Sequence, residues 1–298
     1  MKSLTIVTPF LNEQESILDF IIEIERILLS ISEKFKTKLL LIDDGSTDRT
    51  VEIIDNYPSK IEIQILKLDK NYGHQFALFA GLNKAKNSDF IITLDSDLQD
   101  PPIYINNILE LFQNGSNIVM TKRIKRQDTF VKKINAYIYY RILKFILKRN
   151  DILDSGDYWG IDIESLNNLI IYQNKKILYF RGQLTNLNLN ISKVEINRAP
   201  RMRGTSKYGY KKMLSLGLNG IFCKFDIGSR GYWSFNFKFF LFNTIIFYLI
   251  NYFLGNTSLG YIIGLILSAI LVIMTHLYLV SEIDKKNKLW NFIVSDLK

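Results

Sequence analysis

Two aspartates, Asp95 and Asp97, follow a short apolar segment rich in β-branched residues. Residues 90–94 are typical of a buried strand, and Pro101-Pro102 ends the acidic segment after it. In an open parallel sheet, ligands bind beyond the carboxyl ends of the strands. Two carboxylates without a neighbouring Lys or Arg in the sequence indicate a hard divalent cation that bridges to phosphate oxygens. A solvated acidic turn is the alternative, because the Asp-x-Asp pattern alone is short.

A second acidic segment, Asp43-Asp44, precedes Gly45 and the polar residues 46–48. The apolar run before it predicts a strand, so these carboxylates should lie on the same sheet rim as Asp95. There they could accept hydrogen bonds from a nucleotide base or a ribose, while Gly45 lets the backbone pass close to a ligand. Residues 46–48 could equally do no more than cap the following helix.

Asn71, Gly73 and His74 open a predicted helix after the third predicted strand. The amino end of a helix favours an anion, and Gly73 permits a close approach. We interpret His74 as a polar rim or capping residue rather than a metal ligand. The chain has only two histidines and one cysteine, which disfavours a zinc site.

Up to about residue 122, predicted strands alternate with predicted helices. The strands are expected at 4–9, 38–43, 61–67, 90–95 and 117–121, and the helices at 13–32, 49–56, 74–85 and 103–113. Such alternation is typical of a parallel α/β sheet with right-handed crossovers. The acidic segments then follow strands and meet at one rim of the sheet.

The formal charge of the 298-residue chain is +9. Basic residues gather between tyrosines and apolar residues, several of them close in sequence to a hydrophobic C-terminal region. We therefore favour an anionic lipid surface over nucleic acid as the partner. Two stretches, 130–148 and 207–225, have helical apolar spacing and are predicted as interfacial helices. Residues 151–200 show no clear pattern.

Residues 235–254 and 259–280 form two long apolar segments. At about 1.5 Å per residue, each is long enough to cross a hydrocarbon core of about 30 Å. The residues between them carry no charge, whereas three lysines follow at 285, 286 and 288. The positive-inside rule places both termini in the cytoplasm. Two buried core helices are the alternative, which the lack of a polar face disfavours.

Taken together, the motifs resemble the family 2 glycosyltransferases with the GT-A fold, a Rossmann-like, mostly parallel α/β sheet. The resemblance rests on residues 5–13, Asp43–Asp48, Asn71-x-Gly73 and Asp95–Pro102. More narrowly, the chain is similar to the polyprenyl-phosphate branch, which includes dolichol-phosphate mannose synthase and the bacterial GtrB-like enzymes. That similarity rests on Arg123-x-x-Arg126, Asp154–Asp157 and Arg201–Tyr208. It covers about residues 4–230 and, with the hairpin, nearly the whole chain.

The resemblance implies three groups of site residues. Those facing the nucleotide sugar would be Pro9, Asn12, Glu13, Asp44, Asn71, Gly73, Asp95, Arg123 and Arg126. The cofactor would be Mg²⁺ or Mn²⁺, held by Asp95, Asp97 and Gln99 with Asp97 as the main ligand. The acceptor phosphate would be held by Arg201, Ser206 and Lys207.

The catalytic residues implied by the resemblance are Asp97, Asp157 and Arg201. A phosphate monoester is already mostly anionic at neutral pH, so Asp157 is assigned a positioning or weak-base role. A sugar hydroxyl as the acceptor would instead require Asp157 as a base. Asp154 and Asp157 could also be turn or capping residues around Gly156.

The chain departs from the family pattern at two places. Tyr158-Trp159-Gly160 stands where the family commonly has an aromatic–Arg pair, which leaves the sugar and acceptor open. The region after the second apolar segment lacks the family's usual Gly-Glu-Tyr, which concerns only the tail.

The sequence thus predicts an inverting, metal-dependent hexosyltransferase at the cytoplasmic face of the inner membrane. Its donor would be UDP-glucose or a similar nucleotide sugar, with GDP-mannose as the other option, and its acceptor polyprenyl (undecaprenyl) phosphate. Residues 1–230 would form the catalytic domain, 231–284 a transmembrane hairpin and 285–298 a cytoplasmic basic tail. Relatives associate through their membrane segments, which leaves a homo-oligomer open.

Two competing functions are considered. A membrane-bound enzyme of the same family could add a sugar to a hydroxyl of a lipid-linked saccharide or cell-surface polysaccharide. A membrane-tethered scaffold without catalysis is disfavoured, because every carboxylate of the acidic motifs is present.

Overall fold

The computed structural model describes residues 1–124, 141, 155–172, 178–184, 187, 189–199, 218–220, 222–223, 225, 229–253 and 258–296. Internal contacts divide the chain into two compact units. The first contains a sheet with its covering helices, and the second contains two long helices near the C-terminus.

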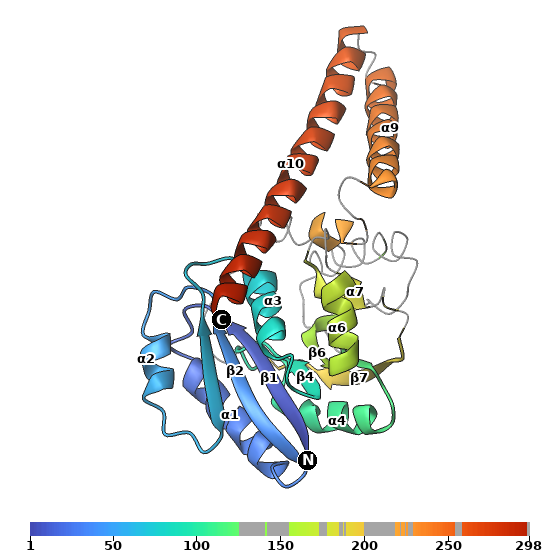
Figure 1. Ribbon diagram of the computed structural model, residues 1–298. Coiled ribbons are helices and arrows are strands. Elements are labelled where there is room, and N and C mark those ends of the chain that lie inside the picture. Colours follow the sequence, from blue (N-terminus) through green and yellow to red (C-terminus); the bar gives the residue numbers. More distant parts are fainter. Residues whose placement is uncertain are drawn as a thin grey trace. The chain divides into compact units, whose positions relative to one another are not determined.

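Within the described residues the sheet has seven strands in the order β3-β2-β1-β4-β6-β5-β7 (Figure 1). The strands are β1 (Lys2–Phe10), β2 (Phe35–Asp43), β3 (Glu62–Lys67), β4 (Phe90–Thr93), β5 (Ile118–Ile124), β6 (Ser155–Asp162) and β7 (Ile191–Asn197). β1, β2, β3 and β4 pair in parallel, as do β5 and β7. β6 runs antiparallel to both β4 and β5. This is a mostly parallel α/β sheet, as predicted.

The chain order reverses at β1, because β2 and β3 lie on one side of this strand and β4 lies on the other. Ligands of open α/β sheets bind in the crevice at such a point, beyond the carboxyl ends of the strands. Asp44 follows β2 directly, and Asp95 follows β4 by two residues. β6 reaches the same rim with its amino-terminal half, since it is antiparallel and places Trp159 opposite Thr93.

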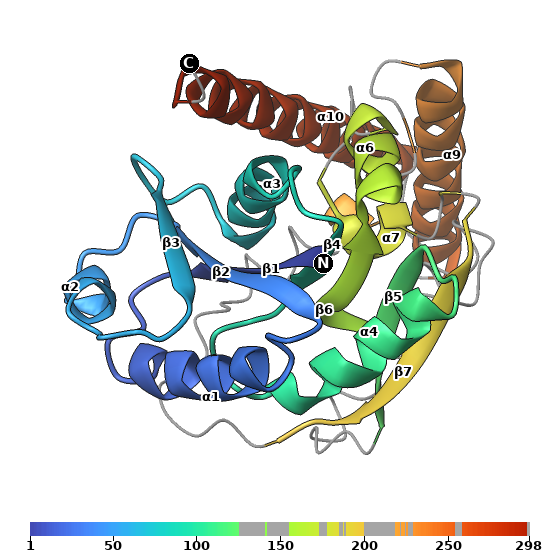
Figure 2. The same ribbon diagram turned by 60° about the horizontal axis from the view of Figure 1, so that its bottom comes forward.

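Helices cover both faces of the sheet (Figure 2). α1 and α4 lie on one face, and α3 lies on the other. The helices of this unit are α1 (Ile17–Ser30), α2 (Thr50–Asp55), α3 (His74–Lys84), the 3₁₀ turn η1 (Pro102–Tyr104), α4 (Ile105–Gln113), α6 (Ile163–Tyr172) and α7 (Phe180–Leu184).

The core follows from the alternation of side chains along the strands. Leu4 and Ile6 of β1 pack in one cluster with Phe20 and Ile24 of α1, all fully buried. Since successive residues point to opposite faces, Val7 lies on the other face, where it too is fully buried. Burying a side chain of this size stabilises the fold by about 1.5–3 kcal/mol relative to exposure.

The predicted alternation of strands and helices up to residue 122 is confirmed. Boundaries differ by a few residues, as where the predicted helix 13–32 begins at Ile17. The region 151–200, which shows no clear pattern in the sequence, contributes β6, α6, α7 and β7 to the first unit. The predicted interfacial helix 130–148 lies outside the described residues except Arg141, as does most of 207–225.

The second unit contains α9 (Arg230–Phe253) and α10 (Ser258–Asp296). Both are long and apolar enough to cross a membrane, over Arg230–Tyr252 and Tyr261–Leu289, and the apolar windows are only 6% and 22% buried. The alternative of two buried core helices therefore does not fit. The helices pack closely, because a Cβ on Gly264 would lie 2.8 Å from the Phe247 Cβ. Of the predicted loop 255–258, residues 255–257 lie outside the described residues, and Ser258 is the first residue of α10.

Candidate active site

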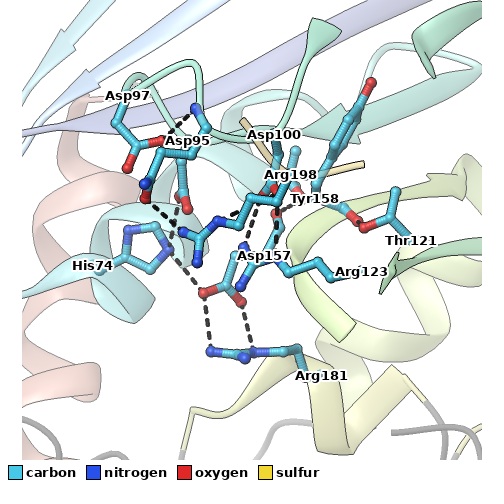
Figure 3. Close-up of polar contacts among 12 residues, drawn as sticks. His74, Asp95, Asp97, Asp100, Thr121, Arg123, Asp157, Tyr158, Arg181 and Arg198 are labelled. Atoms are coloured by element: carbon cyan, nitrogen blue, oxygen red, sulfur yellow. Dashed lines mark hydrogen bonds and ion pairs between the residues drawn. The ribbon is translucent and has the colours of Figure 1, made fainter. Parts of the chain in front are cut away.

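Asp95 and Asp97 lie just beyond β4, where the sequence predicted them (Figure 3). The turn that follows includes Leu98 with a φ of 54°, a left-handed conformation that is costly for a branched residue. It places the Gln99 N–H 3.1 Å from Asp97 Oδ1, which accepts this hydrogen bond. Local strain of this kind often accompanies functional sites.

Asp157 of β6 lies next to this pair and accepts contacts from several directions (Figure 3). The Arg181 guanidinium of α7 reaches both oxygens, with Nε 3.2 Å from Oδ1 and Nη2 3.3 Å from Oδ2. His74 Nε2 lies 3.3 Å from Oδ2. Asp157 therefore lies in a strand within the site, which excludes a role as a turn residue around Gly156.

His74, the first residue of α3, lies between two acids. Its Nε2 is 3.3 Å from Asp157 Oδ2 and 3.6 Å from Asp95 Oδ1. Burial alone would lower the pKa of His74, but the hydrogen bond and charge of Asp157, together with the charge of Asp95, raise it to about 9. The His74 ring thus lies at the rim of the sheet, between the two carboxylates.

Asp100 anchors two guanidinium groups from distant parts of the chain. Arg123 of β5 donates to both of its oxygens, at 3.1 Å and 2.5 Å, and the Nε of Arg198 lies 3.8 Å from Oδ1. Arg198 also donates to Gln99 Oε1 at 2.7 Å. The predicted phosphate-binding Arg123 and the predicted ligand Gln99 thus both lie at the rim, and each contacts a protein partner.

The electrostatics of these acids differ sharply. Burial raises the pKa of Asp95 to about 6, the charges of Asp157, Asp97 and Asp100 add to the rise, and His74 opposes it. Burial also acts on Asp157, but Arg181 and His74 hold the pKa of that carboxyl far below its usual range. The pKa of Asp95 is therefore raised, whereas neighbouring cations keep that of Asp157 low.

The loops after β1 and β2 are joined by side-chain hydrogen bonds. Asn12, with a φ of 52°, donates its N–H to Ser46 Oγ and accepts the Thr47 N–H on Oδ1. The Glu13 N–H donates to Thr50 Oγ1 at 2.8 Å. Pro9, in contrast, is buried within β1.

Asp44 holds the loop that opens α3. Its carboxylate accepts the Tyr72 N–H at 2.7 Å and the Gly73 N–H at 2.9 Å. Burial nevertheless raises the pKa of Asp44 to about 6, against these two hydrogen bonds. Gly45 has a φ of 78°, and a Cβ there would lie 2.7 Å from the backbone nitrogen of Asn71. A glycine is therefore required at this position because the neighbouring loop approaches it closely.

A divalent cation fits the acidic pair on chemical grounds. Among the described residues, no group of three or more His, Cys, Asp and Glu side chains could hold a metal ion. Asp95 and Asp97 nevertheless offer hard oxygen ligands, and burial, together with the neighbouring acids, raises the pKa of Asp95. Mg²⁺ is commonly bound by one or two carboxylates together with substrate phosphates.

Several predicted site residues lie outside the described residues: Arg126, Asp154, Arg201, Ser206 and Lys207. Other residues at the site were missed from the sequence. Asp100, Arg181 and Arg198 belong to this group. Asp100 follows Gln99 in the acidic segment, which was a usable signal. Nothing local distinguishes the two arginines.

Comparison with known proteins gives concordant results. Residues 5–170 match the family described as Glycosyl transferase family 2. An uncharacterized glycosyltransferase of Bacillus subtilis (strain 168), YkcC, is 32% identical over 220 residues, which are 73% of this chain and 67% of the relative. The undecaprenyl-phosphate 4-deoxy-4-formamido-L-arabinose transferase of Pectobacterium carotovorum subsp. carotovorum (strain PC1) is 29% identical over 230 residues, 75% of this chain and 68% of that protein.

Among solved structures, the glucosyl-3-phosphoglycerate synthase of Mycobacterium tuberculosis, in complex with Mn²⁺, UDP-glucose and phosphoglyceric acid, is similar with a TM-score of 0.47. Its sequence is 16% identical, and the match covers 72% of this chain and 76% of that one.

Proposed function

Because the chain belongs to glycosyl transferase family 2 and is a glycosyltransferase, we propose that it transfers a hexose from a nucleotide sugar to a polyprenyl phosphate. The reaction would invert the anomeric centre at the cytoplasmic face of the membrane. A UDP-glucose-like donor is favoured and GDP-mannose is the other option. The undecaprenyl-phosphate transferase among the relatives supports this class of acceptor.

One observation carries the proposal. Asp95 and Asp97 lie beyond β4 and offer carboxylate oxygens at the rim of the sheet. Beside them, Asp100 anchors the guanidinium groups of Arg123 and Arg198. An acidic pair next to fixed guanidinium groups is suited to a diphosphate, which brings both negative charge and a cation.

The chain's own residues would bind and orient the substrates. Asp44 and the Asn12–Glu13 loop would border the nucleoside, while Arg123 and Arg126 would hold the phosphates. Arg201, Ser206 and Lys207 would hold the acceptor phosphate. Mg²⁺ or Mn²⁺ held by Asp95 and Asp97, with Gln99 close by, would neutralise charge on the departing diphosphate.

The contacts of Asp157 favour a positioning role over that of a general base. Both oxygens accept contacts from cationic side chains, and the pKa is held far below its usual range. An acceptor phosphate needs no strong base, because its second pKa is near 6. A hydroxyl acceptor would need one, so this geometry fits a phosphate acceptor better.

The second unit would anchor the enzyme in the membrane. Aromatic side chains lie near both ends of the paired helices, with Tyr232 donating to or accepting from His276 at one end and Tyr248 stacked on Tyr261 at the other. Tyr232 and Tyr248 are 16 positions apart along α9, or about 24 Å at 1.5 Å per residue. Aromatic rings at two interfaces are typical of membrane-spanning segments. The enzyme would then be held at the membrane, where a lipid-linked acceptor is found.

The deciding experiment is product analysis. Detergent-purified protein is incubated with undecaprenyl phosphate, a panel of nucleotide sugars and Mg²⁺ or Mn²⁺, and the lipid fraction is analysed by mass spectrometry. We expect a mass increase of one hexose on undecaprenyl phosphate with one donor. A lengthened lipid-linked saccharide, formed only when a saccharide acceptor is added, would replace this proposal by the hydroxyl-acceptor function.

A further inference from the structure

Arg181 is a buried cation to which the proposed mechanism gives no role. It lies on α7, and its side chain is only 13% exposed. Its guanidinium reaches both oxygens of Asp157, whose side chain is 9% exposed. A planar guanidinium that contacts both oxygens of a carboxylate fixes direction as well as charge.

Two other side chains also contact the Asp157 carboxylate. His74 Nε2 lies 3.3 Å from Oδ2, and Gln75 Nε2 donates to Oδ1 at 3.5 Å. The backbone is held as well, because Thr93 Oγ1 donates to the Asp157 carbonyl at 2.7 Å. The carboxylate therefore cannot rotate without losing at least one ionic contact.

The Gln75 side chain links the start of α3 to the start of α7 and to Asp157. Gln75 Oε1 accepts the Phe180 N–H at 3.1 Å, while its amide nitrogen contacts Asp157. Arg181 follows Phe180 directly, and His74 precedes Gln75. Two neighbouring residues of α3 and one residue of α7 thus contact the same carboxylate of β6.

The contacts continue to the acids beyond β4. His74 Nε2 lies 3.6 Å from Asp95 Oδ1 in addition to its contact with Asp157 (Figure 3). Arg181, Asp157, His74 and Asp95 thus form a continuous line of side-chain contacts. If the Asp157 carboxylate turns, His74 loses the partner that orients its ring toward Asp95.

We propose that Arg181 is a positioning residue for sugar transfer, which fixes the Asp157 carboxylate and, through it, the His74 imidazole beside Asp95. Arg181 does not touch the substrates in this role. The activity test rests on the proposed function, but a spectroscopic test does not.

The first test compares the guanidinium with a point charge. Arg181→Lys keeps the charge and loses the two-point contact, so we expect kcat to fall about tenfold to a hundredfold, the range found for misplaced active-site groups. The KM for the donor should change less than about threefold, because donor contacts stay in place. The kcat of Arg181→Met should fall further, because this variant also loses the charge. Thermal melts confirm that each variant is folded.

A matched control exists on the surface of the same unit. Arg26 contacts Glu23 through the same two nitrogens, Nε and Nη2, at 3.1 Å and 2.7 Å, but its side chain is 60% exposed. Arg26→Lys should therefore leave kcat unchanged. If the kcat of Arg181→Lys equals that of the wild type, the proposal is overturned.

The second test uses the two histidines of the chain, His74 and His276. In protein labelled with ¹³C at histidine Cε1, two ring signals are expected, and His276→Gln identifies that of His276. Arg181→Lys should shift the His74 signal and leave the His276 signal in place. An unmoved His74 signal would overturn the proposal even if kcat fell, because Arg181 would then act by another route.

The two failures remain distinguishable. If the wild-type protein makes no product with any donor, the proposed function fails, and the histidine spectrum alone decides the role of Arg181. If the wild-type protein is active and Arg181→Lys matches it, the inference fails and the proposed function stands.

Discussion

The acids at the sheet rim form two groups that differ in how the protein treats their charge. Asp157 and Asp100 are almost fully buried, and each is bound by guanidinium groups. The Asp95 side chain is 30% exposed, and its pKa is raised to about 6 by burial and by neighbouring acids. A buried carboxylate that is paired with cations can contribute to the stability of the fold. An acid kept among like charges costs stability, which a ligand with a cation would recover.

The strongest test of this difference is Asp97→Asn. The variant removes one of the charges that raise the pKa of Asp95, so folding should be unharmed and the melting temperature unchanged or higher. Turnover should fall on the order of a thousandfold, the cost of removing a main electrostatic contact to the transition state. Product formation and thermal melts measure the two effects.

The control for Asp97→Asn is Glu110→Gln, on the exposed side of α4. It removes the same charge away from the rim and should change neither quantity. A large loss of melting temperature in Asp97→Asn, similar to the loss in activity, would mean that Asp97 also has a structural role and would remove the distinction between the two groups.

Asp100→Asn tests the other group. It leaves the guanidinium groups of Arg123 and Arg198 without their carboxylate partner. Removing one partner of a buried ion pair typically costs about 3–5 kcal/mol, so we expect a loss of this size in the free energy of unfolding. Urea unfolding followed by tryptophan fluorescence measures it. A loss below about 1 kcal/mol would show that water replaces Asp100 without cost.

The acids that directly follow apolar segments show what could be predicted from the sequence. Asp44, Asp95 and Asp97 were found because an apolar run before each predicts a buried parallel strand, and such strands place their carboxyl ends at one rim. Each of these inferences uses only neighbouring residues, so one sequence is sufficient. The same rule gave the alternating elements up to residue 122.

The resemblance named Asp157, but the strand that carries it and the arginine partners of Asp157 and Asp100 could not be predicted. β6 contains Gly156, Asp157 and Gly160, which weaken the alternation that marks a strand. α7 has only five residues and lacks a full helical period. The partners Arg181 and Asp157 are 24 positions apart, and Arg198 is 98 positions from Asp100. Tertiary contacts of this kind carry no local signal.

A smaller effect is expected at Glu25 of α1, a buried acid satisfied by uncharged donors away from the rim. Its carboxylate accepts the Lys60 N–H, the Tyr57 hydroxyl at 2.8 Å and the Ser59 hydroxyl at 3.1 Å. The Lys60 N–H is the main reason that the pKa of Glu25 is lowered. Glu25→Gln should therefore cost about 1–2 kcal/mol at pH 7.

The pH dependence of this variant follows from the sign of the shift. A lowered pKa supplies stability that is present above the ordinary value of 4.5 and is lost as the pH falls through the folded-state value. The difference between wild type and Glu25→Gln should therefore shrink below about pH 4.5. A difference that stays constant down to pH 3 would show that packing, rather than charge, is responsible.

Asp44 has features of both groups, so Asp44→Asn gives the finest comparison. Its carboxylate accepts two backbone N–H groups, yet burial raises its pKa to about 6 from an ordinary value of 3.8. A raised pKa means that protonation stabilises the fold, and this contribution is lost as the pH rises through about 6. An asparagine can still accept a hydrogen bond from the loop but does not ionise.

Relative to wild type, Asp44→Asn should therefore gain stability between pH 5 and pH 7.5, and at the upper end it should lie within about 1 kcal/mol of wild type. Melting temperatures at the two pH values measure this gain. An equal loss at both values would mean that the two N–H groups fully offset the burial of the charge, which would place Asp44 with Asp157 as a structural acid.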